Sequence, residues 1–221
     1  MATRFYTDPT NAPSVSPAFN GGWTDTSQAI RRQLVLDSPG VNDSITIQLD
    51  ETATYNDTIL AAQFVSPPLN ALDPVQMSGI KASFRLLESN AKANVYLYLR
   101  YRKCDGDGSN VGEFYDGFAI DTTEADESVL TNRNLSTYGG DTSLAQGQRV
   151  VIEVGLFFEY SKVSSYTGSI SITDNSGTDL GANNTDTAAY NSGIEIGDTF
   201  TVASGDPPWE VVKLGPMFAF A

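Results

Sequence analysis

The stretch Arg149–Tyr160 (RVVIEVGLFFEY) sets the main limit on how this chain can fold. One of its faces carries Val150, Ile152, Val154, Leu156, Phe158 and Tyr160. The other carries Arg149, Val151, Glu153, Gly155, Phe157 and Glu159. This period-two alternation predicts a β-strand with one face in a core. Because Val151 and Phe157 make the second face partly apolar, we expect the strand to be central in its sheet. A Glu153→Gln change is expected to be mild, since that side chain points away from the core.

Two further segments show the same alternation. In Asn94–Arg102 (NVYLYLRYR) the apolar residues alternate with tyrosine and arginine, which predicts the partner strand of Arg149–Tyr160. In Gly79–Leu87 apolar and polar residues also alternate, and we expect a hairpin with Asn94–Arg102 across Glu88–Ala93.

Shorter strands are predicted over Ile30–Leu36, Ser44–Leu49, Ile59–Ser66, Glu113–Ile120, Gly168–Thr173, Phe200–Ala203, Trp209–Leu214 and Met217–Phe220. Polar segments 131–147 and 174–193 read as loops, and only 123–130 or 141–146 could form a short helix. The fold prediction is an all-β, two-sheet antiparallel sandwich. A jelly roll is the first choice and another Greek-key sandwich the second.

Residues 1–29 read as an extended N-terminal arm, followed by one sandwich domain over residues 30–221. Pro9, Pro13 and Pro17 recur every four residues, which favours an extended path. The arm also carries four aromatic residues, which suit docking on an apolar surface: Phe5, Tyr6, Phe19 and Trp23. They pack either on the chain's own sandwich or on a neighbouring subunit, where they would be the attachment residues.

The overall charge restricts the partners. A net charge of −14 repels phosphate backbones, so no nucleic-acid binding is expected. No hydrophobic run has transmembrane length, and the N-terminus lacks the pattern of a signal peptide, so we expect no membrane association and synthesis in a cytoplasm. With Cys104 as the only cysteine, an intrachain disulfide is excluded.

Several sequence pieces resemble an uncharacterised family of tailed-phage virion structural proteins. They are MATRFY at the start, APSVSPAF at 12–19, GW at 22–23, AIRRQL at 29–34, ESNAKAN at 88–94, GQRVVIEVG at 147–155 and DNSGTDL at 174–180. None of these motifs is catalytic. The resemblance implies a structural role in the virion, without specifying the capsid or the tail.

The sequence contains few residues of the kinds that enzymes use for catalysis. There is no histidine, which removes the most common general base and metal ligand. Cys104 stands next to acidic residues that would raise its pKa, making it a poor nucleophile. A carboxylate pair could still hydrolyse polysaccharide, with Glu153 and Glu159, or Glu113, Asp116 and Asp121, as the available acids. We expect no catalytic residue and no cofactor.

The sequence also contains two weaker patterns that could bind a ligand. The segment 105–116 (DGDGSNVGEFYD) has the oxygen spacing of a calcium loop, in Asp105, Asp107, Ser109, Glu113 and Asp116. Asn110 replaces its glycine and the flanks are strands, so an acidic hairpin loop is the preferred interpretation. Tyrosines that could stack on sugars are Tyr96, Tyr98 and Tyr101 on a strand and Tyr138, Tyr166 and Tyr190 in loops.

These features lead to a functional hypothesis. The chain is expected to be a non-enzymatic capsid cement or decoration protein on the outer shell of a bacteriophage. Its expected partners are the major capsid protein or other virion proteins, and copies of itself in a homo-oligomer. The alternative is a tail-associated binding module that contacts host-surface glycans, and a polysaccharide-cleaving enzyme ranks last.

Overall fold

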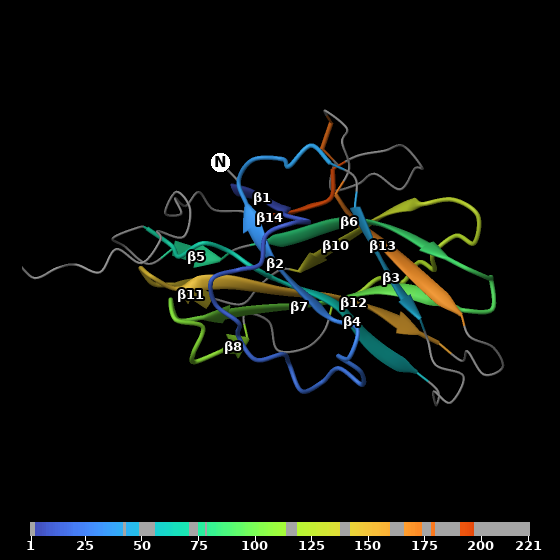
Figure 1. The fold of residues 1–221 in the computed structure, drawn as a ribbon, viewed down its shortest axis with the longest axis horizontal. Coiled ribbons are helices and arrows are strands. Elements are labelled where there is room, and N and C mark those ends of the chain that lie inside the picture. The colour runs from blue at the N-terminus through green and yellow to red at the C-terminus, as the bar shows by residue number, and fades with distance from the viewer. Residues whose placement is uncertain are drawn as a thin grey trace, which may run out of the picture.

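A computed structural model shows an all-β fold (Figure 1). It describes residues 3–41, 43–48, 56–70, 75–77, 79–113, 119–137, 142–159, 166–173, 178–179 and 191–196. Within these ranges there is no α-helix, neither at 123–130 nor elsewhere, and hence none long and apolar enough to cross a membrane.

The described residues form fourteen strands. They are β1 (Thr3–Thr7), β2 (Ile30–Val35), β3 (Asp43–Gln48), β4 (Asp57–Val65), β5 (Val75–Met77), β6 (Ile80–Glu88), β7 (Val95–Cys104), β8 (Gly112–Glu113), β9 (Ala119–Ile120), β10 (Thr131–Thr137), β11 (Thr142–Leu144), β12 (Arg149–Phe158), β13 (Thr167–Thr173) and β14 (Gly193–Ile196).

Twelve strands join in one sheet that folds over on itself as a sandwich. Its order is β3-β13-β6-β14-β1-β2-β4-β12-β7-β8, with β10 on β6 and β9 on β7. β5 and β11 form a separate two-stranded sheet. In Figure 1 the strands β6, β10, β13 and β14 lie in the layer above β4, β7 and β12. β2 and β4 run parallel, whereas the other paired strands are antiparallel. The all-β sandwich is thereby confirmed; the jelly-roll connectivity stays a prediction.

Strand β1 connects the two layers. Its residues Thr3–Phe5 pair with β14 in one layer, and Tyr6–Thr7 pair with β2 in the other. A strand therefore lies within residues 1–29, where the sequence predicts only an extended arm. The five residues TRFYT are too few to show a period, and their pairing depends on strands far along the chain.

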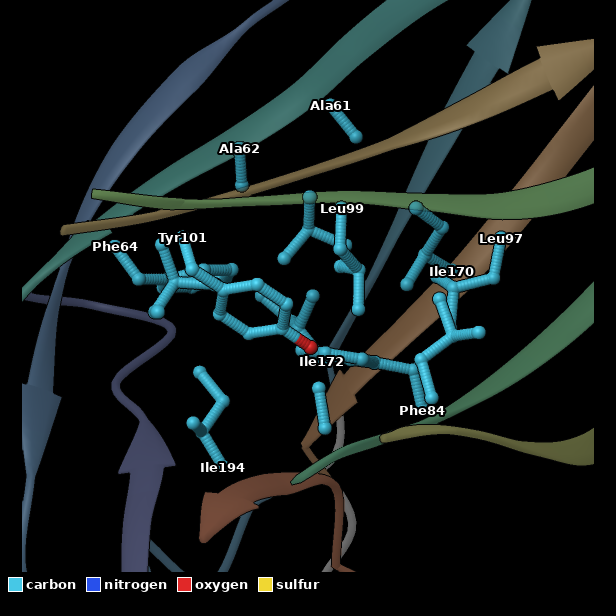
Figure 2. Packing of buried hydrophobic residues seen from close by; sticks show 14 of the residues in the cluster. Ala61, Ala62, Phe64, Phe84, Leu97, Leu99, Tyr101, Ile170, Ile172 and Ile194 are labelled. Atoms are coloured by element: carbon cyan, nitrogen blue, oxygen red, sulfur yellow. The ribbon is translucent and has the colours of Figure 1, made fainter. Parts of the chain in front are cut away.

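The core lies between the two layers (Figure 2). The inward face of β12 is buried as predicted, through Val150, Ile152, Val154, Leu156 and Phe158. The central position of β12 is also confirmed, because it pairs with β4 on one side and β7 on the other.

Tyr101 also points into this core and is fully buried, which raises the pKa of its phenol. It is therefore not available to stack on a sugar, and its prediction as a sugar-binding tyrosine is wrong. It follows Arg100 on β7, so its side chain falls on the same inward face as Leu97 and Leu99.

The predicted hairpin of residues 79–87 with 94–102 is wrong. β6 pairs with β10, β13 and β14, whereas β7 pairs with β12, β8 and β9. The connection between β6 and β7 crosses from one layer to the other, and Asn94 at its end has a positive φ of 46°. Alternation identifies the face of a strand but not its neighbour, which explains the error.

Three strands fall in segments predicted as loops. β10 lies in the polar segment 131–147 and pairs with β6 over seven residues. β11 lies in the same segment and pairs with β5, so the short helix considered at 141–146 is wrong. β14 lies at the end of the predicted loop 174–193 and pairs with both β1 and β6. The strands predicted at 200–203, 209–214 and 217–220 lie outside the described residues.

Candidate functional site

The most elaborate polar cluster lies on the outer face of β4, β12 and β7, where the N-terminal segment passes over the sheet. Glu153 of β12 stands at its centre with 0% of its surface exposed. Gln63 of β4 lies directly opposite Glu153 on one side, and Arg100 of β7 on the other. The segment that carries Asn20 and Trp23 covers this face, so both faces of β12 are buried.

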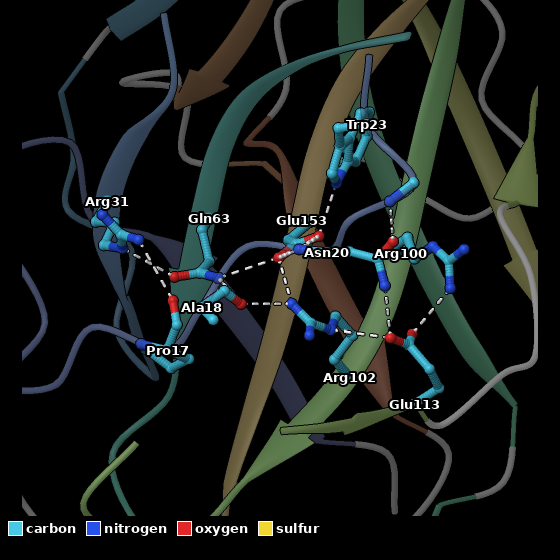
Figure 3. Close-up of polar contacts among 11 residues, drawn as sticks. Pro17, Ala18, Asn20, Trp23, Arg31, Gln63, Arg100, Arg102, Glu113 and Glu153 are labelled. Atoms are coloured by element: carbon cyan, nitrogen blue, oxygen red, sulfur yellow. Dashed lines mark hydrogen bonds and ion pairs between the residues drawn. The ribbon is translucent and has the colours of Figure 1, made fainter. Parts of the chain in front are cut away.

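Four donors meet the Glu153 carboxylate (Figure 3). Arg102 Nη1 donates at 2.6 Å and Trp23 Nε1 at 2.7 Å. Gln63 Nε2 and the Asn20 amide each donate at 3.0 Å. A buried carboxylate is tolerated only when it is paired and hydrogen-bonded, and this one has a cation and three further donors.

A second acid extends the cluster toward the surface. Glu113 Oε1 accepts hydrogen bonds from Arg102 Nε at 3.0 Å and Asn20 Nδ2 at 2.7 Å, and Oε2 forms an ion pair with Arg100 Nη1 at 3.2 Å. Arg102 Nη1 also donates to the carbonyl of Ala18 at 2.7 Å. The arm segment is thus held through its backbone and side chains by charges of β7, β8 and β12.

Trp23 fits on the sheet because of a glycine. A Cβ at Gly155 would collide with the carbonyl of Ile59 and with the Trp23 ring. The register of β12 against β4 also shifts between Val154 and Gly155, which indicates a β-bulge at this point. The Trp23 ring meets Tyr98 edge-on with centroids 5.5 Å apart. Gly155 therefore makes room for the largest side chain of the arm.

The four aromatic residues proposed for attachment all contact their own chain. Phe5 lies in the core at 0% exposure and Trp23 is 6% exposed. Phe19 is partly exposed under the Arg31 guanidinium, 3.9 Å from its ring centroid. The partly exposed Tyr6 donates its hydroxyl to Asp179 at 2.9 Å; burial and this acid raise the pKa of Tyr6. Attachment to another protein stays a prediction, and only Tyr6 and Phe19 of the four present accessible surface for it.

The residues of the predicted calcium loop form hydrogen bonds and ion pairs with different protein groups. Asp105 accepts from Asn110 and Gln148, and Asp107 accepts from Ser109. These bonds lower the pKa of both acids. Glu113 turns instead to the arginines of the Glu153 cluster, and Asp116 lies outside the described residues. Among the residues that the structure describes, no three acids, cysteines or histidines are close enough to hold a metal.

The remaining chemical candidates are also engaged in the fold. Cys104 is buried, and mainly this burial raises the pKa of its thiol to about 11, which disfavours the thiolate. The carboxylate of Asp121 lies 3.5 Å from Arg133 Nε. Glu153 and Glu113, two acids of the hydrolase hypothesis, are bound by arginine.

Sequence reasoning misses this cluster, although the sequence holds one signal of it. Gln63 interrupts the apolar run of β4 (DTILAAQFV), and a lone amide in a buried strand requires polar partners. Asn20 and Ala18 carry no such signal, because their contacts with Glu153 and Arg102 use backbone groups that other residues would also supply.

Comparisons with known proteins give a distant fold likeness and no family. No known protein family matches the chain, and no curated protein does. A CocE/NonD family hydrolase from Staphylococcus aureus is similar at TM-score 0.49 and 10% identity, over 89% of this chain and 36% of that one. An aminopeptidase from a marine sediment Thaumarchaeota archaeon gives 0.49 and 7% over the same shares.

The Eiger TNF of S. frugiperda has a TM-score of 0.30 at 8% identity, over 82% of this chain and 98% of that one. The chain thus spans about a third of the length of the hydrolase and of the aminopeptidase. None of these likenesses reaches the level at which it would support a function.

Proposed function

We propose that this chain is a non-enzymatic structural protein of a tailed-phage virion, and specifically a decoration protein on the outer face of the capsid. The observation that carries the proposal is the set of sequence pieces that resemble tailed-phage structural proteins, from MATRFY to DNSGTDL. The net charge of −14 supports a location on the outside of the shell, away from the packaged nucleic acid.

The arm is the part of the chain that we expect to contact the capsid. Residues Thr10–Ser16 are mostly exposed, while Asn20 and Trp23 anchor the same segment to Glu153. An extended segment held in place by its own chain gives up little conformational entropy when a partner binds it. We propose that the exposed segment Thr10–Ser16, together with Phe19, contacts the capsid lattice.

The number of copies per virion tests the capsid location. Purified particles would be analysed by quantitative mass spectrometry, with the major capsid protein as the internal standard. A decoration protein should occur in a simple ratio to the capsid protein, because it occupies repeated lattice positions. A copy number far below that of the capsid protein would place it in the tail and contradict the proposal.

A row of aromatic side chains favours the second candidate, a tail-associated module that binds host glycans. Tyr96, Phe157 and Tyr98 follow one another on the outer face of β7 and β12, with ring centroids 6.1 and 6.0 Å apart. All three are partly exposed, as a sugar-stacking surface requires. Binding on a glycan array that is lost in Tyr96→Ala would favour this candidate; equal binding of that variant would not.

A further inference from the structure

A buried acid at the end of β6 has no role in the clusters described above. Glu88 is 2% exposed, and its carboxylate accepts the backbone amide of Val95 at 3.0 Å. The Glu88 amide donates to the carbonyl of Asp126, also at 3.0 Å. Glu88 therefore lies where the β6–β7 crossover meets the segment 121–130.

The charged groups that face Glu88 are acidic. Glu124 and Glu127 belong to the segment 121–130, which is held beside Glu88 because the Ala125 amide donates to the carbonyl of Val95 at 2.8 Å. Both acids raise the pKa of Glu88. On the β7 side lies Tyr96, and burial first, then the nearby Glu124, Glu159 and Glu88, raise the pKa of its phenol. On β13 the residue opposite is Gly168, which carries no charge.

Arg133, the arginine near this site, makes its contacts with other groups. Arg133 donates to the backbone carbonyl of Glu124, and its Nε lies 3.5 Å from Asp121. Oε1 of Glu124 is buried and receives no hydrogen bond from an N–H or O–H group in the described residues. A proton on the Glu88 carboxyl would supply the missing donor.

We propose that protonated Glu88 donates to the buried Oε1 of Glu124, which closes a pH-dependent clasp between the β6–β7 crossover and the segment 121–130. With the proton in place, the pair is a neutral acid bonded to a carboxylate. Without it, two negative charges face each other in a buried site, with Glu127 adding a third nearby. The clasp is then expected to loosen, starting at Glu88 and its contact with Val95.

Burial first, and then Glu124, raise the pKa of Glu88 from 4.5 to about 7. A carboxyl whose pKa is higher in the folded than in the unfolded chain holds its proton more tightly when folded. Its contribution to stability is therefore complete below about pH 4.5, and it is lost as the pH rises through about 7.

Carbon-13 NMR of the full chain, labelled at the glutamate side-chain carboxyls, tests the proton on Glu88 directly. We expect one resonance to titrate near pH 7, well above an ordinary glutamate at about 4.3. Glu88→Gln should remove it. Glu124→Gln should move it toward the ordinary value, because an amide at that position donates to Glu88 without needing the proton. If no glutamate titrates above about pH 6, or if Glu124→Gln leaves the resonance in place, the proposal is overturned.

Chemical denaturation provides a second measurement with a matched control. The unfolding midpoint of the wild-type protein should fall between about pH 5.5 and about pH 8, and both Glu88→Gln and Glu124→Gln should flatten this fall. Glu127→Gln removes a nearby exposed charge and should leave most of it. If the control flattens the fall as much as the other two, general repulsion among the acids explains the effect and the clasp is refuted. Circular dichroism at the acidic end of the range verifies that each variant is folded.

Discussion

Glu153 shows that a side chain on the outer face of a strand can be as buried as one in the core. It points away from the sandwich interior, yet it is 0% exposed and receives four hydrogen-bond donors, one of them from Arg102. The expectation that Glu153→Gln is mild therefore has a false premise. Alternation shows in which direction the side chain points, whereas its burial depends on the arm that covers it.

Replacing Glu153 by glutamine should lower the free energy of unfolding by about 3 kcal/mol, because Arg102 loses its fully buried partner and keeps only the partly exposed Glu113. The amide of the new side chain would also point a donor at Arg102, Trp23 or Gln63. Urea denaturation followed by circular dichroism measures the loss.

Glu159→Gln is the matched control for this change. Glu159 follows the same strand and is partly exposed, so its substitution should change stability by less than about 0.5 kcal/mol. Equal losses of unfolding free energy in the two variants would show that the charge of Glu153 contributes no more to stability than that of Glu159.

Strand β1 makes the beginning of the arm part of the sheet. It lies between β14 and β2 in the sheet, and its Phe5 is part of the core. The sequence predicts an arm that ends at residue 29, but five residues before that boundary belong to the sheet. Deleting them would remove the strand through which the hydrogen-bonded sheet passes from one layer to the other.

A protein lacking residues 1–22 should consequently lose its cooperative thermal transition, because the deletion removes β1 and the Asn20 contacts with Glu153 and Glu113. Far-ultraviolet circular dichroism during heating measures this loss. The exposed Ser14 offers a mild change in the same segment, and Ser14→Ala should keep the transition. A sharp transition in the truncated protein would show that residues 30–221 fold without the arm.

Sequence reasoning finds the long strands and misses those that depend on distant partners. Arg149–Phe158 and Val95–Cys104 show their period within ten residues each, and the sequence predicts both with the correct faces. β10 (TNRNLST) has no apolar period and owes its conformation to the backbone of β6. The Glu153 cluster escapes prediction for a similar reason, because its residues come from the arm and from the four strands β4, β7, β8 and β12, which only the fold brings together.

The charge of the whole molecule sets its response to salt. With 27 acidic and 13 basic residues, the folded chain repels itself over distances that depend on ionic strength. The buried pair of Arg102 and Glu153 is screened much less than surface charges are. Salt should therefore weaken the repulsion more than it weakens the attraction.

The melting temperature should thus rise as sodium chloride increases from about 0.01 M to about 0.3 M, where the screening length falls below about 10 Å. Differential scanning calorimetry at constant pH measures this rise. Sulfate salts are unsuitable, because they also strengthen apolar burial. A melting temperature that falls with sodium chloride would show that attractive surface pairs outweigh the net charge.

The pairing of β1 with β14 has a consequence for the nascent chain. Arg4 and Glu195, which are bonded across these strands, are 191 positions apart. At about 5–20 residues per second, a ribosome needs roughly 10–40 s between the two. Through most of that interval β1 has left the exit tunnel without its neighbour β14. The last step of folding should therefore follow the synthesis of β14, and a translating chain stalled before residue 193 should expose Thr3–Phe5, without their partner strand, to chaperones.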